Sequence, residues 1–246
     1  MDGAWTRDLT EEEIGGLAAD IHRCGFGAIE NYISAEELAD IRALAATKVQ
    51  QAGGQYVALE GPGAVETTVL AEIGRSPGFS RICRRLFELG TGKSAAGEDF
   101  VQLVRCLQGA TGQSNSNMFH YDSYVVTVII AIAVPDSGRR GDLVLFRNPR
   151  AIRRSYFANT FDKMMVDNPV SQWFFRFAAR HDRPGVARVA IRPGTAYFIW
   201  GYRTLHANEP CDEDKLRVTA VFHLGNPHKD SFMRRMSRAV RRRAHY

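Results

Sequence analysis

From residue 99 onward, the sequence consists mainly of β-branched and aromatic runs, and no regular helical pattern alternates with them. The runs are FVQLVRCL, YVVTVIIAIAV, DLVLF, VARVAI, TAYFIW and LRVTAVFHL, separated by turns that contain Gly, Pro or Asp. A doubly wound parallel sheet needs a helix after each strand, so this order favours an antiparallel double sheet. We therefore predict a mainly β fold with flanking helices and a jelly-roll-like core.

Helices are predicted ahead of these strands. Thr10 is followed three residues later by Glu13, and Ser34 by Glu37, and the residues that follow each pair are apolar at helical spacing. A Ser or Thr with Glu three positions beyond it is the capping box that begins many helices. The predicted helices cover residues 10–24, 34–51 and 79–89.

The length and composition suit one domain. The chain has 246 residues, of which 45% are hydrophobic, so it can bury a sizeable core. No period repeats, which excludes solenoids and propellers. We predict a single domain over residues 1–246, with helices at about 10–95 and a β core at about 99–225. A helical insert at about 159–182 interrupts the strands, and inserts of this length often form lids or binding loops.

Basic residues are concentrated at the end of the chain. Residues 228–246 contain seven Lys and Arg against one Asp, a local charge of +6, whereas the whole chain carries +5. The rest of the chain is therefore close to neutral, and a nucleic-acid-binding protein that uses this tail is the alternative function. The tail also has an apolar stripe that suits a terminal helix packed on the body, at Phe232, Met236, Ala239 and Val240.

The sequence indicates neither a membrane span nor a secreted protein. The apolar stretch Tyr124–Pro135 is far shorter than the roughly 18 residues that cross a bilayer. The first twenty residues are rich in charge and lack the apolar core of a signal peptide. We expect a cytoplasmic protein without a membrane partner. Reduced thiols are expected for the cysteines, which form no C-x-x-C pair: Cys24, Cys83, Cys106 and Cys211.

The segment Phe119–Tyr124 carries the main chemical signal. His120 and Asp122 stand two residues apart at the entrance to the most hydrophobic predicted strand. In an extended chain such residues point to the same face, so both side chains can reach one metal ion. A second H-x-D, at His228–Asp230, begins the basic tail and is followed by no strand, so we assign it to the surface.

His206 and Arg217 give this H-x-D its context. Both are equally far from the centre of the turn-rich segment 209–214, so we predict a hairpin that places them opposite each other on one face. Two histidines and one carboxylate with open coordination positions form the facial triad of non-haem Fe(II) oxygenases. An arginine nearby offers a planar fork for a carboxylate.

Each of these residues, taken alone, has a structural alternative. A histidine can be a satisfied core or surface residue, Asp122 can cap a turn, and Arg217 can extend from a strand to solvent. The joint pattern favours the metal site over these alternatives. A metal-dependent, cupin-like isomerase is another possible function for such a site, but it is disfavoured because it would leave Arg217 without a role. We give the structural interpretation to the remaining histidines of the body and the chain end, which are His22, His181, His223 and His245.

The chain resembles the Fe(II)/2-oxoglutarate-dependent dioxygenases, and within them the phytanoyl-CoA dioxygenase-like branch. The resemblance covers about residues 25–225 and is carried by FGAIENYISAEELADIRALA, HYD and HANEPCDEDKLR. It implies that His120, Asp122 and His206 bind Fe(II) and that Arg217 holds the distal carboxylate of 2-oxoglutarate. The implied fold is a double-stranded β-helix, a jelly-roll core of the cupin-like type.

The resemblance also implies further contacts to the co-substrate. A polar side chain shortly after the second histidine is expected, and Asn208 stands there. Another contact is expected from the strand before the H-x-D, where Gln102 and Arg105 are both candidates that the sequence does not separate.

The implied reaction consumes molecular oxygen, releases succinate and CO2, and oxidises a C–H bond, with hydroxylation as the simplest outcome and desaturation or cyclisation as alternatives. We expect the substrate to be a small metabolite or a natural-product intermediate. Four arginines in the segment 147–154 could receive an acidic group of that substrate, and a solvated loop is the alternative for them.

Overall fold

The computed structural model describes residues 8–95, 97–147 and 156–227, and within these ranges the strands form two sheets. The larger sheet has six strands in the order β1 (Gly27–Ile29), β7 (Ala196–Ile199), β4 (Val126–Ala133), β9 (Arg217–Leu224), β3 (Val101–Leu107) and β2 (Val57–Glu60). The smaller has three, in the order β6 (Val186–Val189), β5 (Leu143–Phe146) and β8 (Leu205–Asn208). All their pairings are antiparallel, which confirms the predicted double sheet.

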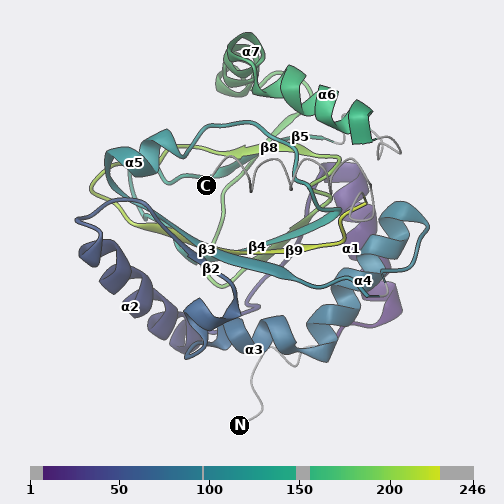
Figure 1. Cartoon of the computed structure of the whole chain (residues 1–246), viewed down its shortest axis with the longest axis horizontal. Helices are drawn as coiled ribbons and strands as arrows, with labels where there is room; N and C mark the ends of the chain where they lie inside the picture. The colour runs from purple at the N-terminus through teal and green to yellow at the C-terminus, as the bar shows by residue number, and fades with distance from the viewer. Residues whose placement is uncertain (1–7, 96, 148–155, 228–246) are drawn as a thin grey trace, which may run out of the picture.

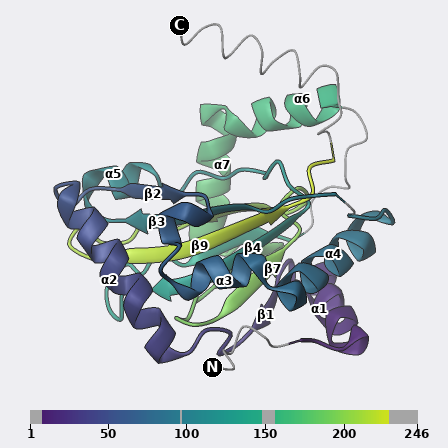
Figure 2. The same cartoon turned by 60° about the horizontal axis from the view of Figure 1, so that its bottom comes forward.

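The two sheets face each other, and helices cover both outer surfaces (Figure 1). On the larger sheet lie α1 (Glu11–Cys24), α2 (Ala35–Gln51), α3 (Val69–Arg75) and α4 (Pro77–Thr91), as Figure 2 also shows. Both predicted capping boxes are present, with Thr10 and Ser34 at the starts of α1 and α2. The main core fills the space between these helices and the sheet; for example, the rings of Phe79 and Phe222 lie 5.0 Å apart.

Four short elements lie outside the predicted set. They are β2, the 3-10 helix η2 (Pro62–Val65), α3 and α5 (Gly109–Ser114). Each has seven or fewer residues, too few to display a helical or strand period clearly. The edge strand β2 matters for the site, because it pairs with β3 and brings Tyr56 to the end of the pocket.

The predicted insert between β5 and β6 consists of α6 (Tyr156–Asp167) and α7 (Pro169–Arg180). It lies over the outer surface of the smaller sheet (Figure 1). An apolar cluster joins the insert to the smaller sheet. In it, Val166 and Ala179 of the helices meet Leu205 and Ala207 of β8. The apolar pattern of the insert predicted a helix, and α6 and α7 are helices. The same pattern is not a sign of burial here, because most of the apolar face is exposed. The exposed large side chains of the insert are Phe161, Met164, Met165, Val170, Trp173, Phe174 and Phe177.

The predicted hairpin of His206 and Arg217 is wrong. His206 lies on β8, which pairs with β5 in the smaller sheet, whereas Arg217 begins β9, which pairs with β3 and β4 in the larger one. The connection 209–216 therefore passes from one sheet to the other. Its eight residues, with a bridge between Cys211 and Arg140, are long enough for this crossing, and sequence distance alone does not distinguish it from a hairpin.

Within the described residues, no helix combines the length and the apolar character that a membrane crossing requires. The stretch Tyr124–Pro135 supplies the buried strand β4 instead. The predicted tail helix at 228–246, the second H-x-D and most of the arginine-rich segment 147–154 lie outside the described residues.

Candidate active site

The space between the two sheets contains a pocket of about 280 Å³. Strand β9 lines it with every second residue, from Arg217 through Thr219 and Val221 to His223, as strand geometry requires. At six residues' separation, the two ends of this row stand roughly 20 Å apart along the strand. The pocket is therefore long, with an arginine at one end and a histidine at the other.

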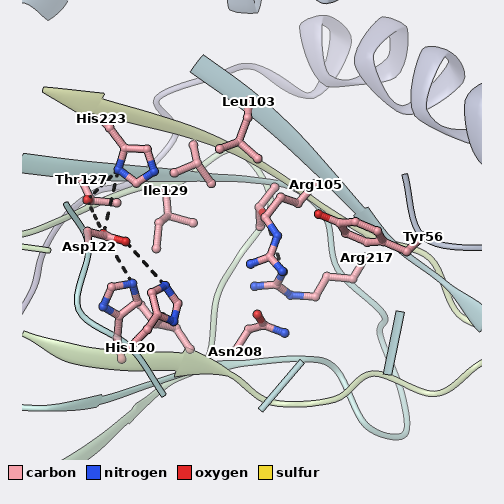
Figure 3. A pocket seen from close by; sticks show the side chains of 14 residues that line it. Tyr56, Leu103, Arg105, His120, Asp122, Thr127, Ile129, Asn208, Arg217 and His223 are labelled. Carbon is pink, nitrogen blue, oxygen red and sulfur yellow. Dashed lines mark hydrogen bonds and ion pairs between the residues drawn. The ribbon is translucent and has the colours of Figure 1, made fainter. Parts of the chain in front are cut away.

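His120, Asp122 and His206 come together in this pocket (Figure 3). The main chains of His120 and His206 bond each other in both directions, at 3.0 and 3.1 Å, so the entry to β4 is fixed to β8. Asp122 Oδ1 lies 3.5 Å from His120 Nε2, and Asp122 Oδ2 lies 3.6 Å from His206 Nε2. Their three potential ligand atoms all lie within 4.8 Å of one another.

The second nitrogen of each histidine identifies the protonation of its ring. His120 Nδ1 lies 2.8 Å from the carbonyl oxygen of Met118, and His206 Nδ1 lies 3.0 Å from that of Thr204. A carbonyl oxygen only accepts hydrogen bonds, so both Nδ1 atoms carry the proton. In the neutral rings, Nε2 then has a free lone pair, and both Nε2 atoms face the Asp122 carboxylate.

Three electron-rich atoms therefore converge, and electrostatic repulsion between them calls for a cation. A divalent metal ion satisfies this requirement, because imidazole nitrogen and carboxylate oxygen are ligands of iron and its neighbours. The hydrogen bonds at Nδ1 also orient the rings in the manner usual for metal-binding histidines. The residues present thus fit a metal centre with two histidines and one carboxylate.

The electrostatics of the site agree with this assignment. Burial lowers the pKa of His206 to about 4, so this imidazole is neutral at pH 7 and free to bind a metal. Burial alone would raise the pKa of Asp122, but the imidazoles of His206, His223 and His120 bring it well below its usual value. For His120, burial lowers the pKa, and the hydrogen bond and charge of Asp122 outweigh that effect and raise it.

Arg217 is a buried cation at the opposite end of the pocket. Its side chain is 3% exposed, Nε donates to the carbonyl oxygen of Gly141 at 2.6 Å, and Nη1 lies 3.4 Å from Thr219 Oγ1. Burial, with a smaller effect of the Arg105 charge, lowers its pKa to about 10, so it stays charged at pH 7. Among the described residues, no carboxylate lies within ion-pair distance of it. A buried guanidinium of this kind fits an anionic ligand.

The structure separates the two candidates on β3. Arg105 lines the pocket, stacks over Tyr56 at 5.8 Å and donates to the carbonyl oxygen of Asn115 at 2.9 Å. Gln102 points to the opposite face, where its amide donates to the carbonyl oxygen of Leu70 at 3.1 Å. Positions 102 and 105 are an odd number apart on one strand, so only one of them can face the pocket. Gln102 is therefore not among the residues that the pocket brings together.

Asn208 lines the same end of the pocket as Arg217 and Arg105, as Figure 3 shows. Its side-chain nitrogen donates to the carbonyl oxygen of Glu209 at 3.1 Å. The side-chain oxygen is the atom that Figure 3 draws toward the pocket centre. The arginine end therefore combines two cations with polar groups from β8 and from Tyr56, which directly precedes β2.

Sequence reasoning missed four polar residues of this pocket: Tyr56, Thr127, Thr219 and His223. We predicted a structural role for His223, yet it faces the pocket beside Asp122, with Nδ1 3.9 Å from Asp122 Oδ2. His223 and Arg217 are six residues apart on one strand, and residues an even number apart share a face. The sequence could therefore have predicted that His223 lies in the pocket with Arg217. Tyr56 gave no such signal, because β2 is too short to be recognised.

Comparison with known proteins identifies the fold. No protein-family model matches the chain, and no curated protein matches its sequence. Among solved structures, the α-ketoglutarate-dependent non-haem epimerase SnoN from nogalamycin biosynthesis has a TM-score of 0.55 at 18% identity, over 87% of this chain and 84% of that one. This chain has the fold of the Fe(II)/2-oxoglutarate-dependent oxygenases.

Two further structures agree with this result. The α-ketoglutarate-dependent carbocyclase SnoK from nogalamycin biosynthesis has a TM-score of 0.54 at 17% identity, over 94% of this chain and 92% of that one. A 2OG-Fe(II) oxygenase-family oxidoreductase from Burkholderia pseudomallei has a TM-score of 0.52 at 14% identity, over 89% and 93%. The predicted double-stranded β-helix is thus confirmed as the fold, whereas the phytanoyl-CoA dioxygenase-like branch stays a prediction.

Proposed function

We propose that this chain is an Fe(II)- and 2-oxoglutarate-dependent oxygenase. One observation supports the proposal above all: the lone pairs of His120 and His206 converge with the Asp122 carboxylate at one end of a pocket whose other end holds the buried cation Arg217. A metal ion and a dicarboxylate would satisfy both ends at once. The fold shared with oxygenases of this type adds support.

In this proposal, His120, Asp122 and His206 hold Fe(II), and Arg217 holds the distal carboxylate of 2-oxoglutarate. Arg105, with Tyr56 stacked against it, adds a second positive charge at that end. A dicarboxylate therefore meets opposite charge at both of its ends. Asn208 offers a polar contact beside Arg217. Gln102 has no part in the proposal, because it faces away from the pocket.

Iron with 2-oxoglutarate supplies the activation of dioxygen and the oxidative decarboxylation that yields succinate and CO2. The protein's own residues bind and orient the metal, the co-substrate and the substrate, and they exclude water from the pocket. Apolar side chains of both sheets face the pocket between its charged ends, among them Leu103, Ile129, Leu143 and Val221. They keep the polar contacts in a dry environment, where those contacts are stronger.

The proposed substrate is a small metabolite or a natural-product intermediate, and the proposed outcome is hydroxylation of a C–H bond. SnoN and SnoK are described as an epimerase and a carbocyclase of nogalamycin biosynthesis, so this fold supports more than one reaction outcome. Desaturation or cyclisation are therefore alternatives for the same site. A single domain and a cytoplasmic location stay predictions of the sequence.

Anaerobic titration with Fe(II) and 2-oxoglutarate tests the proposal. We expect a saturable visible charge-transfer band in the wild-type protein, its loss in His206→Ala, and a higher 2-oxoglutarate requirement in Arg217→Ala. Admission of oxygen should then convert 2-oxoglutarate to succinate. A folded wild-type protein that binds neither Fe(II) nor 2-oxoglutarate would overturn the proposal. The nucleic-acid alternative depends on the tail at 228–246, and a steeply salt-dependent complex with an oligonucleotide would favour it.

A further inference from the structure

We infer that Thr127 and His223 are positioning residues that set the orientation of the Asp122 carboxylate. The inference rests on the proposed function, in which Asp122 is a metal ligand. Thr127 of β4 and His223 of β9 are direct cross-strand partners, so their side chains stand side by side on the pocket face. Figure 3 shows both above Asp122, on the side away from His120.

The hydrogen bonds between these three residues run in one direction. Thr127 Oγ1 lies 2.6 Å from Asp122 Oδ2, and because a carboxylate only accepts, the hydroxyl donates its single proton there. The same hydroxyl oxygen lies 3.0 Å from His223 Nδ1. Having given up its proton, it must accept, so His223 donates from Nδ1. A chain of two bonds thus leads from His223 through Thr127 to Asp122.

The main chain of Gly201 closes the other side of this arrangement. The amide of Asp122 donates to the carbonyl oxygen of Gly201 at 2.9 Å. A Cβ on Gly201 would lie 2.9 Å from Asp122 Cβ and would overlap both Asp122 Oδ2 and Thr127 Oγ1. Only a glycine therefore allows the backbone to approach the bond between Thr127 and Asp122 so closely.

The ring of His223 is held in turn by Tyr124. The two rings are stacked, with centroids 4.9 Å apart and an angle of 18° between their planes. His223 therefore has a fixed partner on its face and a fixed bond at Nδ1. Oδ2 of Asp122 accepts the Thr127 bond on the side opposite His206 Nε2, which lies 3.6 Å from it, and the carboxylate is thereby held with Oδ1 3.5 Å from His120 Nε2. Without this support, the carboxylate could rotate about its terminal torsion and present its oxygens differently.

Co(II) binding under anaerobic conditions tests the inference without any turnover. Thr127→Val keeps the shape of the side chain and removes the hydroxyl, so we expect the Kd for Co(II) to rise about 10-fold to 100-fold, the effect usual for lost partners of metal ligands. The visible d–d spectrum of bound Co(II) should change as well. Thr127→Ser, which restores the hydroxyl, should return both toward wild type. Thr68→Val is the control, since Thr68 is a buried threonine that bonds Val65 away from the pocket.

A pair of substitutions at His223 gives an independent measurement if Thr127→Val fails to fold. His223→Asn keeps a donor near the place of Nδ1, whereas His223→Phe keeps the stacked ring and loses the donor. We expect a larger rise in Kd for His223→Phe. Equal Kd values and spectra in wild type, folded Thr127→Val and both His223 variants would overturn the inference. Failure of the wild-type protein to bind Co(II) would instead overturn the proposed function.

Discussion

Gln172 of α7 bonds both main-chain groups of Phe119, the residue directly before His120. Its Oε1 accepts from the Phe119 amide at 3.0 Å, and its Nε2 donates to the Phe119 carbonyl oxygen at 2.7 Å and to that of Val166 at 2.9 Å. Gln172 is only 3% exposed. The inserted helices therefore fix the segment that carries two of the proposed metal ligands.

Two more residues of the insert bond to this segment. Arg176 of α7 donates to the carbonyl oxygen of Asn117 at 3.1 Å, and Lys163 of α6 donates to Ser123 Oγ at 2.9 Å. Contacts thus reach both ends of the segment and its middle. In this structure the insert supports the proposed ligands, in addition to any part it has as a lid.

We expect Gln172→Met to destabilise the protein by about 2–4 kcal/mol, because it leaves one buried amide and two buried carbonyl oxygens without this partner. Urea unfolding of the metal-free protein measures the effect. Gln50→Met is the matched control on the exposed surface of α2, and it should change the free energy of unfolding by less than about 0.5 kcal/mol. Similar results for the two variants would show that the bonds to Phe119 contribute nothing to stability.

Much of the fold could be predicted from local signals. The capping boxes at Thr10 and Ser34 and the long apolar strands determine their elements locally, through caps and periods that the sequence displays. The pairing of β8 with β5 could not be predicted, because it depends on where the connection 209–216 leads. His206 and Arg217 still share a pocket, since the two sheets that carry them face each other.

The site shows the same division between local and non-local information. His120 and Asp122 were predictable from strand alternation, which is local. That Thr127 stands beside His223 depends on the register between β4 and β9, which only the folded sheet determines. The choice of Arg105 over Gln102 needed one fact, the face of β3 that meets the pocket, and strand parity then decided the rest.

Arg217→Ala should weaken 2-oxoglutarate binding about 10-fold to 100-fold, because it removes a charge-assisted pair of about 1.5–3 kcal/mol. The Kd for Co(II) alone should stay unchanged, since Arg217 lies at the other end of the pocket. Arg217→Lys should restore little of the loss, because an ammonium lacks the fork that bonds Gly141 and a carboxylate together. Calorimetric titration of Co(II)-loaded protein with 2-oxoglutarate measures this; an unaffected Arg217→Ala would assign the anchoring to Arg105.

Acid should destabilise the metal-free protein in part through His206. Its pKa is about 4 in the folded state, against about 6.5 in an unfolded chain. Between these values the unfolded state binds a proton that the folded state excludes, so the free energy of unfolding falls as the pH drops from about 6.5 to 4. Urea midpoints at pH 7 and pH 5 should therefore differ more in wild type than in His206→Gln. Parallel pH dependence in the two proteins would contradict the prediction.

Gly141→Ala should weaken 2-oxoglutarate binding while the metal centre stays intact. Gly141 has φ +75°, and a Cβ there would lie 2.9 Å from Arg217 Nε and overlap Arg217 Cδ, so the guanidinium must move from its place. Gly92→Ala is the matched control, because Gly92 has φ +69° in the left-handed region and open space within 4 Å of its Cβ position. Both variants incur a left-handed backbone cost of about 1–2 kcal/mol, and comparable thermal midpoints would verify this. Only Gly141→Ala should raise the Kd for 2-oxoglutarate in Co(II)-loaded protein, and an equal Kd in the two variants would show that the position of Arg217 does not determine co-substrate affinity.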